Sequence, residues 1–229
     1  VELQYWEQTQ TVSTKTTVVL LSPGGDRSFL RTTGGGNAIN KQDGERVHWP
    51  NIAHLHIGGC YSLRSLLAED LAAVLKSAKS FGVITSVDTV WSSEGIWSSI
   101  LPALPWVDHF LPSLSEARMI TGTQEPRQIC DWLRNHGAQT IAIKLGDQGT
   151  FLAQGNQHTQ IPAFAQKVID TTGAGDAFCA GYIAALQFGK SVIEAVRWGN
   201  AWGAVAISAV GATTALHRRE QLFEKLNQN

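Results

Sequence analysis

Short runs of apolar and β-branched residues alternate along this chain with longer segments in which apolar residues recur every three or four positions. The short runs predict β-strands, and the recurring spacing predicts helices with one buried face. The predicted strands cover residues 16–21, 28–32, 53–57, 83–87, 108–111, 140–144, 150–153 and 158–161. The predicted helices cover residues 65–80, 95–101, 128–136, 176–188 and 191–208, and a polar helix starts at residue 218.

The order of these elements predicts the fold class. From residue 53 onward strands alternate with helices, which is typical of an α/β fold with a parallel sheet covered on both faces. The first two predicted strands flank a turn cluster at 22–26 and are expected to pair as a hairpin, as are the last two. The glycine run at 34–37 has no strong strand before it, so we interpret it as a flexible connector.

Composition and charge narrow the classes of function. The chain has 229 residues and a formal net charge of −1, with no basic run that would bind nucleic acid. It holds no apolar run long enough to span a bilayer and no secretory signal, so no membrane role is expected. Cys60, Cys130 and Cys179 lie far apart and are odd in number, which favours reduced, packed thiols in a cytoplasmic protein.

The segment 170–178, with the sequence DTTGAGDAF, carries the strongest chemical signal. A strand end at 168–169 is expected to run into a glycine turn and then into a helix. Free N–H groups and the helix dipole at such a junction attract an anion, most often a phosphate, and Gly173 and Gly175 let it approach the backbone. Asp176 would repel that anion, so its expected role is to take a proton from a hydroxyl that attacks the phosphorus.

A simpler interpretation is that the glycines form only a tight turn and that Asp176 only complements the helix dipole. The whole segment, however, resembles the C-terminal signature of the ribokinase-like, or PfkB-type, carbohydrate kinases. This resemblance implies a three-layer α/β fold with a mostly parallel central sheet, helices on both faces and a small β lid. It also implies an ATP-dependent kinase of small sugars or sugar-like alcohols, with Asp176 as the catalytic base and Gly173, Ala174 and Gly175 as the anion hole.

Further stretches match the same family in the same order along the chain. The strand that ends at Gly58 and Gly59 resembles the edge of the family's sugar site, and Asp88 resembles an aspartate at the edge of the phosphate-transfer region. The sequence PSLSEA resembles a P-N-x-x-E motif whose glutamate, here Glu116, organises Mg²⁺ and phosphate through water, with Ser113 in place of the usual asparagine. Singly, each could be a turn residue or a helix cap, and their shared order favours the kinase resemblance.

The implied nucleotide site lies later in the chain. The sequence KLGDQG, with Lys144, Gly146 and Gly149, resembles a loop that lies along the nucleotide. Asn200 falls where the family lines the adenine pocket, and Thr172 belongs to the nucleotide side of the signature. The resemblance therefore implies ATP and a small-molecule sugar as the partners of this chain.

The resemblance also implies cations. Mg²⁺ prefers few carboxylates together with water and phosphate oxygens, so no carboxylate cluster is expected around Glu116. Asp170 and Thr172, with a loop at Gly211, correspond to a site that binds a monovalent cation such as K⁺ in many members. His54 and His56 alternate on one predicted strand, and packed or hydrogen-bonded roles are favoured over metal binding because no third ligand stands at a suitable spacing.

The first hairpin resembles the family's lid over the sugar. Arg27 and Phe29 match the lid pattern, and Arg27 is either a solvated hairpin charge or a substrate contact. We therefore divide the chain into residues 1–34, a remnant of the β lid, and residues 35–229, an α/β core for nucleotide binding and catalysis. Because the hairpin leaves strand edges and family members commonly dimerise through their lids, a homodimer is expected.

The family pattern begins upstream of Val1, and the only methionine is Met119, so we expect this chain to be part of a longer translation product that supplies the opening strands of the fold. The residues that separate sugars from nucleosides would fall mostly in that part. Two alternatives to a sugar kinase therefore stay open. One is a nucleoside kinase of the same fold, and the other is a non-catalytic fragment or pseudokinase that acts through its surface.

Overall fold

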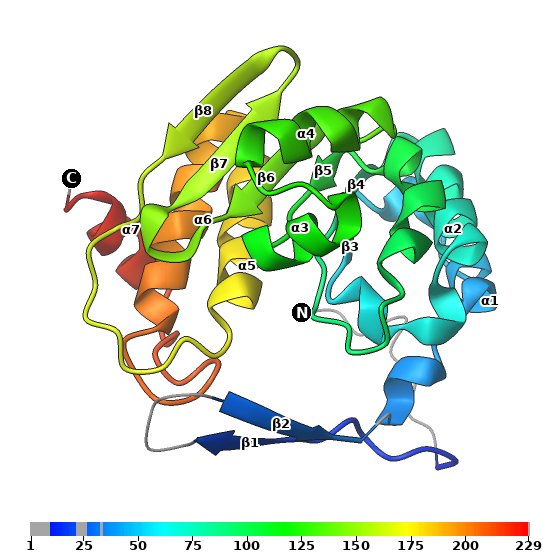
Figure 1. The fold of residues 1–229 in the computed structure, drawn as a ribbon, viewed down its shortest axis with the longest axis horizontal. Helices are drawn as coiled ribbons and strands as arrows, with labels where there is room; N and C mark the ends of the chain where they lie inside the picture. The colour runs from blue at the N-terminus through cyan, green and yellow to red at the C-terminus, as the bar shows by residue number, and fades with distance from the viewer. Residues whose placement is uncertain (1–9, 22–26, 33, 229) are drawn as a thin grey trace.

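A six-stranded sheet crosses the protein, and a separate two-stranded hairpin lies beside it (Figure 1). The computed structural model describes residues 10–21, 27–32 and 34–228. The strands of the large sheet follow one another in sequence order, so each is a direct neighbour of the next along the chain. Their bounds are β3 (His54–Ile57), β4 (Ile84–Val87), β5 (His109–Phe110), β6 (Thr140–Lys144), β7 (Thr150–Gln154) and β8 (Gln157–Ile161).

The large sheet is mixed. The first four of its strands, from β3 to β6, run parallel, and β7 and β8 form an antiparallel hairpin at one edge. This confirms both the mostly parallel sheet and the second hairpin that the sequence predicts. The parallel strands all point their carboxyl ends to the same edge, where ligands bind in open α/β sheets.

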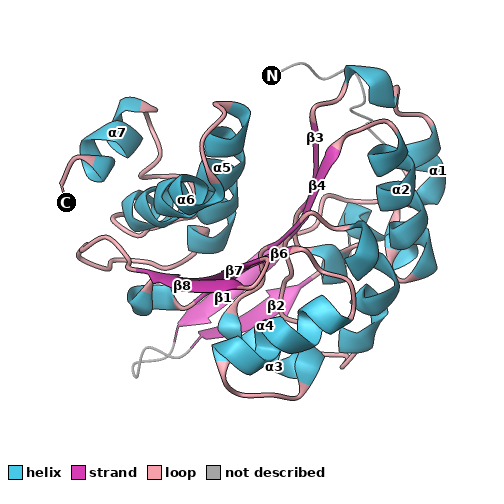
Figure 2. Cartoon of the chain, turned by 90° about the horizontal axis from the view of Figure 1, so that it is seen from above, coloured by secondary structure: helices cyan, strands magenta, loops and turns pink. Residues whose placement is uncertain are grey.

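Helices cover both faces of the sheet, which gives the three layers seen in Figure 2. One face carries α1 (Lys41–Glu45), α2 (Glu69–Ser80), α3 (Leu114–Thr121) and α4 (Pro126–Asn135). The other face carries α5 (Ala174–Gln187), α6 (Val192–Ala206) and α7 (Glu220–Leu226). The helices α2, α4, α5, α6 and α7 fall where the sequence predicts helices, within a few residues at each end.

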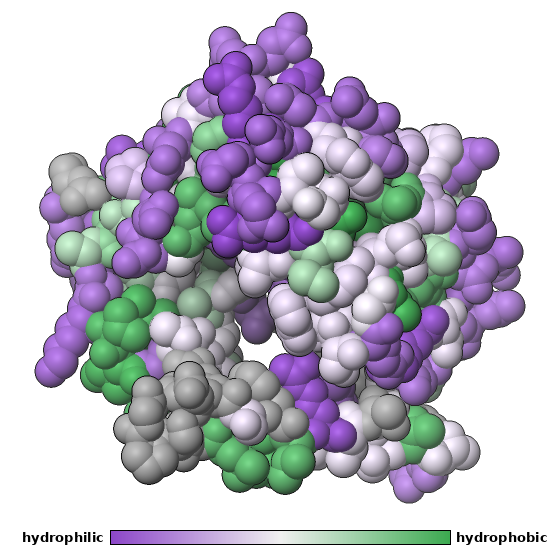
Figure 3. All heavy atoms as spheres, viewed as in Figure 1, coloured by the Kyte–Doolittle hydropathy of each residue, from purple (hydrophilic) through white to green (hydrophobic). Residues whose placement is uncertain are grey.

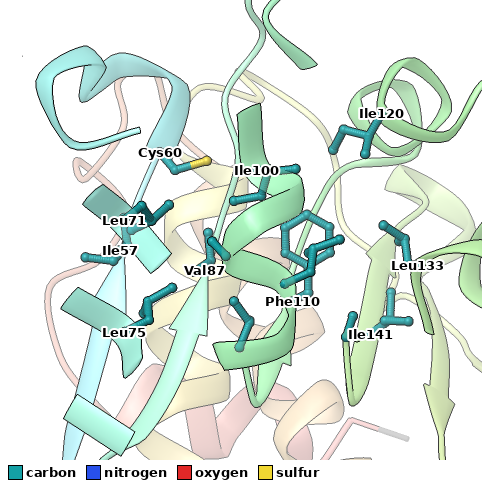
Figure 4. Packing of buried hydrophobic residues seen from close by; sticks show 14 of the residues in the cluster. Ile57, Cys60, Leu71, Leu75, Val87, Ile100, Phe110, Ile120, Leu133 and Ile141 are labelled. Carbon is teal, nitrogen blue, oxygen red and sulfur yellow. The ribbon is translucent and has the colours of Figure 1, made fainter. Parts of the chain in front are cut away.

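Two cores stabilise this arrangement, one on each face of the sheet. Residues of β6 alternate between them, because Ile141 and Ile143 belong to one core and Ala142 to the other. Such a strand is buried on both faces and reads as a continuous apolar run rather than an alternating one. Figure 4 shows the first core, in which Val87 and Phe110 of neighbouring strands pack among the side chains of the covering helices.

The hairpin of β1 (Thr17–Leu21) and β2 (Arg27–Arg31) forms its own antiparallel sheet, with Thr17 opposite Arg31. This confirms the predicted first hairpin. Val18, Leu20 and Leu30 are all exposed on it, and Figure 3 shows apolar atoms along this part of the surface. An opening separates the hairpin from the body of the protein in the same view.

The strand end predicted at 168–169 is wrong. Residues 162–171 form no strand, and both Val168 and Ile169 are more than half exposed. The N–H of Ile169 donates to the carbonyl oxygen of Ile207 over 2.8 Å, so this segment is hydrogen-bonded to the end of α6 instead of joining the sheet. The β-branched side chains favour an extended backbone here, but the segment pairs with no strand among the described residues.

Five further segments differ from the sequence prediction, one of them being α1, where no helix was predicted. The helix predicted to begin at residue 65 begins at Glu69, because Ala68 adopts a positive φ of 56° that a continuous helix cannot include. Residues Trp97–Trp106 form a 3₁₀ helix that contains two prolines, and the glycine run Gly34–Asn37 is a 3₁₀ turn rather than a flexible connector. The sequence prediction did not include α3.

Candidate active site

A cleft of about 980 Å³ opens at the carboxyl ends of the parallel strands, between the sheet, α5 and α6. Eleven of the residues singled out from the sequence line it. They are Gly59, Asp88, Ser113, Glu116, Lys144, Gly146, Gly149, Ala174, Gly175, Asp176 and Asn200. Segments that lie far apart in the chain therefore meet at one site, as the predicted topology requires.

The N-terminus of α5 forms one wall of this cleft. Gly173 is the residue before the helix and has a φ of +79°, and a Cβ placed on it would come within 2.5 Å of the carbonyl oxygen of Ala212. Only glycine fits both the conformation and the space. Ala174, Gly175 and Asp176 follow on the first turn and line the cleft, whereas Gly173 packs beneath them and does not line it. The sequence hypothesis placed Gly173 in the anion hole, and the structure gives it this supporting position.

Asp176 is exposed on the first turn of α5 and lines the cleft. A carboxylate in this place is accessible to a hydroxyl group of a bound molecule. The N–H of Ala174 donates to the carbonyl oxygen of Thr171 at 3.3 Å, whereas the N–H groups of Gly175 and Asp176, in the first turn of the helix, have no intrahelical acceptor and can serve a ligand in the cleft. A proton acceptor and an anion-binding backbone therefore lie on one turn of one helix.

Glu116 and Ser113 form a capping box at the start of α3. Oε2 of Glu116 accepts hydrogen bonds from the N–H of Ser113 at 2.9 Å and from Oγ1 of Thr89 at 2.7 Å, and Oγ of Ser113 accepts from the N–H of Glu116 at 3.4 Å. The serine thus serves as the helix cap, a role that its short hydroxyl fills well. Both residues also line the cleft, so the capping interpretation and the functional one apply together.

A metal ion at this site would depend on few protein ligands. No group of three or more His, Cys, Asp or Glu side chains within the described part of the chain could hold a metal ion. The hydrogen bonds that Glu116 accepts from Thr89 and Ser113 both end on Oε2. Oε1 of this buried carboxylate is therefore the atom that can accept a hydrogen bond from a water molecule of a hydrated Mg²⁺, which normally keeps several of its waters.

Asp88 and Lys144 meet at the base of the cleft. Nζ of Lys144 lies 2.6 Å from Oδ1 of Asp88, which also accepts from the N–H of Thr89 at 2.8 Å. Burial acts to lower the pKa of Lys144, but Asp88 and the neighbouring acidic groups outweigh it and hold that pKa above its ordinary value. The lysine of this pair therefore carries a positive charge.

Gly149 and Asn200 shape the opposite wall. Gly149 has a φ of +85°, and a Cβ on it would come within 2.1 Å of the carbonyl oxygen of Ile161. The side chain of Asn200 accepts from Oγ1 of Thr150 and donates to the carbonyl oxygens of Ile161 and Pro162. Both polar atoms of the Asn200 side chain are thus hydrogen-bonded within the protein. Any contribution of this residue to a nucleotide pocket comes from van der Waals contact at the cleft surface.

Asp170, Thr172 and Gly211 are brought together, but none of them lines the cleft. Oδ1 of Asp170 accepts from N–H and Oγ1 of Thr172 at 2.9 and 2.7 Å, and Oδ2 accepts from the N–H of Gly211 at 3.0 Å. This carboxylate ties the loop before α5 to the loop after α6. Of the other two sequence candidates, Gly58 follows β3 without lining the cleft, and the side chain of Arg27 falls outside what the structure describes.

The two histidines of β3 are hydrogen-bonded within the protein, as the sequence predicts. Nε2 of His54 and Nδ1 of His56 both lie within 2.8 Å of Oγ of Ser86 on the neighbouring strand. Burial, followed by the repulsion of Lys144, lowers the pKa of His56 to about 4. These histidines are therefore neutral members of the sheet.

Sequence reasoning missed several lining residues. Thr89, Val90, Phe164, Val168 and Ile207 all border the cleft. Thr89 and Val90 could have been found, since they directly follow the strand that ends at Asp88. The other three come from irregular segments: Val168 was predicted as a strand end and Ile207 as part of a helix, which gave no sign that they face a cleft, and Phe164 lay in no predicted element.

The cysteines agree with the sequence analysis. Cys60, Cys130 and Cys179 are free and buried, which confirms packed thiols. No helix in the described ranges combines the length and the apolar character needed to cross a membrane.

Comparison with known proteins extends over nearly the whole chain. The family described as "pfkB family carbohydrate kinase" matches residues 1–219. A 2-dehydro-3-deoxygluconokinase of Bacillus subtilis is 28% identical over 208 residues, which are 87% of this chain and 64% of that protein. A ribokinase of Haemophilus influenzae is 32% identical over 128 residues, covering 54% of this chain and 42% of the relative. This chain therefore spans less than two thirds of the length of either relative.

Solved structures share the fold. A ribokinase of Arabidopsis thaliana, complexed with ribose and ATP, superposes with a TM-score of 0.80 at 24% identity and covers 96% of this chain and 71% of its own. A ribokinase of Thermotoga maritima gives a TM-score of 0.75 at 22% identity, with 94% of this chain and 70% of its own covered. The ribokinase-like fold expected from the sequence is thereby confirmed.

Proposed function

Because this chain belongs to the pfkB family of carbohydrate kinases, we propose that its cleft transfers the terminal phosphoryl group of ATP to a hydroxymethyl group of a small sugar or sugar-like alcohol. The observation that carries the proposal is the meeting of Asp176, the first turn of α5, Glu116 and Lys144 in one cleft. A cleft of about 980 Å³ is of the size that small-molecule sites of proteins typically have.

In the proposed reaction, Asp176 accepts the proton of the sugar hydroxyl as the hydroxyl oxygen attacks the γ-phosphorus. A new O–P bond forms, the bond between the γ-phosphorus and the bridging oxygen breaks, and its electron pair stays with ADP. The proton then leaves Asp176 for solvent. Catalysis of this kind depends mainly on alignment and on stabilising charge, and the N–H groups of Gly175 and Asp176 would donate to the phosphoryl oxygens, since the N–H of Ala174 donates to the carbonyl oxygen of Thr171.

Mg²⁺ is the expected metal. When bound, it would neutralise charge on the phosphate groups. Glu116 would orient waters of the hydrated ion, and Ser113 keeps Glu116 in place through the capping box. The loops joined by Asp170, Thr172 and Gly211 are the proposed site of a monovalent cation, and K⁺ is the ion expected there.

Residues 1–34 are the proposed lid over the acceptor, and residues 35–229 form the catalytic core. The hairpin has exposed apolar side chains on β1 and β2 and open strand edges, which favours pairing with a second copy of the chain. We therefore propose a homodimer joined through the lid. Light scattering that gives twice the chain mass would support this, and a monomer mass at micromolar concentration would refute it.

A nucleoside kinase is the second candidate. An aminoimidazole riboside kinase of Salmonella typhimurium is 36% identical over 115 residues, although these are only 48% of this chain. A panel of ribose, fructose, 2-keto-3-deoxygluconate and adenosine, assayed with ATP and Mg²⁺ by ADP release, separates the two. Turnover on one of the first three supports a sugar kinase, turnover on adenosine alone supports the nucleoside kinase, and retained ATP binding with no turnover on any acceptor favours the non-catalytic alternative.

A further inference from the structure

Lys144 occupies an unusual position at the end of β6. Its backbone N–H donates to the carbonyl oxygen of Pro112 over 2.9 Å, and a parallel bridge pairs it with Ser113. Its side chain is 15% exposed, and that of its partner Asp88 is 7% exposed. Backbone and side chain are thus both held, so the ammonium group has one defined place in the cleft.

That place is against the start of α5. A Cβ built on Gly175 would lie 3.4 Å from Nζ of Lys144, so the ammonium group lies close to the helix at the residue just before Asp176. The absence of a side chain at Gly175 leaves room for this approach. The positive end of the helix dipole and a full positive charge therefore border the same small space.

The charges of the cleft make this cation important. Among the described residues that line the cleft, Lys144 is the only lysine or arginine, and it shares the cleft with four carboxylates: Asp88, Glu116, Asp147 and Asp176. A triphosphate entering such a site meets net repulsion unless a cation offsets it. The ammonium group has three N–H donors, and among the described residues its one side-chain hydrogen bond, to Asp88, uses a single one.

Stability alone gives a weak reason for such a pair. A buried lysine–aspartate pair is often no more stable than well-packed apolar side chains of the same volume, because both charges lose their hydration. The pair is therefore better explained by an electrostatic task in the cleft than by a contribution to folding.

We propose that Lys144 contacts the phosphoryl group during its transfer, and that Asp88 is a positioning residue that holds the ammonium group against the first turn of α5. This inference rests on the proposed kinase function and adds a residue to it. When the oxygens of the γ-phosphoryl group are bound to the N–H groups of α5, they would also accept hydrogen bonds from the two remaining N–H donors of Lys144. The cation then stabilises charge that is present on ATP and in the transition state but absent from the same position in ADP.

The test compares binding of ADP, ATP and ADP with aluminium fluoride, a mimic of the transferring phosphoryl group, by calorimetry in the presence of Mg²⁺. Lys144→Met removes the charge but leaves Asp88 buried and unpaired, which can unfold the protein. The decisive variant is therefore Lys144→Met with Asp88→Asn, which removes both charges. Circular dichroism checks that it is folded.

The expected result is a loss of discrimination between ADP and ADP with aluminium fluoride. The double variant should bind ADP within a few-fold of the unsubstituted protein but bind ADP with aluminium fluoride about 10²-fold more weakly. Lys79→Met with Asp108→Asn is the matched control. This pair is also partly buried, but it lies at the ends of β4 and β5 that face away from the cleft. It should leave the ratio of the two affinities unchanged.

Two results would overturn the inference, and they differ in meaning. Suppose that the unsubstituted protein binds ADP with aluminium fluoride more tightly than ADP, and that the folded double variant does so equally well. Lys144 then has no role at the phosphoryl group, and the proposed kinase function stands. If the unsubstituted protein binds neither nucleotide, the proposed function and this inference both fall.

Discussion

Oγ1 of Thr150 donates a buried hydrogen bond of 2.7 Å to Oδ1 of Asn200, which joins the start of β7 to the middle of α6. The amide nitrogen of the same asparagine donates to two carbonyl oxygens at the end of β8. One side chain thus fixes both strands of the edge hairpin to the helix that faces them. The wall of the cleft on the proposed nucleotide side depends on this connection.

Asn200→Ala is expected to destabilise the protein. Thr150 and two carbonyl oxygens would lose their partner in a buried setting, which typically reduces the free energy of unfolding by about 1–3 kcal/mol. Urea denaturation measures the change. Asn51→Ala, at an exposed position, is the matched control and should stay within about 0.5 kcal/mol. An equal effect of the two substitutions would contradict the structural role of Asn200.

Asp176→Asn is expected to lower kcat by about 10²–10⁴, because an amide cannot take the proton of the acceptor hydroxyl. ATP binding should persist, since removing a negative charge does not weaken the hold on a phosphate. The assay is ADP release with the best acceptor of the substrate panel, together with calorimetric binding of ATP.

The control for Asp176 is Asp70→Asn, because Asp70 is also an exposed aspartate in the first turn of a helix, here α2. Both substitutions remove a favourable interaction with a helix dipole, which is worth about 0.3–1 kcal/mol. Only the one at Asp176 should affect turnover. Near-normal kcat in Asp176→Asn would remove this residue from the mechanism and leave it as a dipole partner.

Gly173 and Gly175 form a natural comparison at the start of α5. Gly173→Ala places a Cβ 2.5 Å from a backbone oxygen at a φ of +79°. The free energy of unfolding is therefore expected to fall by about 1–3 kcal/mol. Gly175→Ala meets only the flexible end of Lys144 at 3.4 Å and should change stability little. Thermal unfolding compares the two. Equal stability of both variants would show that the turn before α5 is not confined in this way.

Much of the site could be predicted because strand ends and glycine turns leave local marks in a sequence. Asp88 directly follows one predicted strand and Lys144 ends another, and the parallel topology then places them at one edge of the sheet. The first turn of α5 begins a predicted helix. The resemblance of short motifs to a known family gave the roles proposed for them, and their order along the chain made the resemblance specific.

The rest depended on contacts between distant residues, which no local pattern contains. Val168 and Ile169 have strand propensity, yet the segment leans on the end of α6 and remains irregular. Gly173 looks like part of an anion hole, but its space is filled by Ala212 from a loop that follows α6. The ion pair between Asp88 and Lys144 joins residues 56 positions apart, so only the folded sheet brings it into view.

The histidines of the sheet predict how stability depends on pH. Burial is the first cause that lowers the pKa values of His54, His56 and His109 from 6.5 to about 4. The groups around them are Ser86, Tyr182, Lys144, Lys79 and Asp108, and Asp108 opposes the shift at His54 and His109.

Between pH about 4 and 6.5 the unfolded chain therefore binds more protons than the folded protein at these three positions. The free energy of unfolding should consequently rise with pH across this window and lose that contribution as the pH falls through it. Urea denaturation at several pH values measures the slope. His56→Gln, which keeps a hydrogen-bonding group beside Ser86, should make the slope shallower, whereas His217→Gln at an exposed position should not. A slope that is the same in all three proteins would mean that His56 titrates alike in the folded and unfolded states.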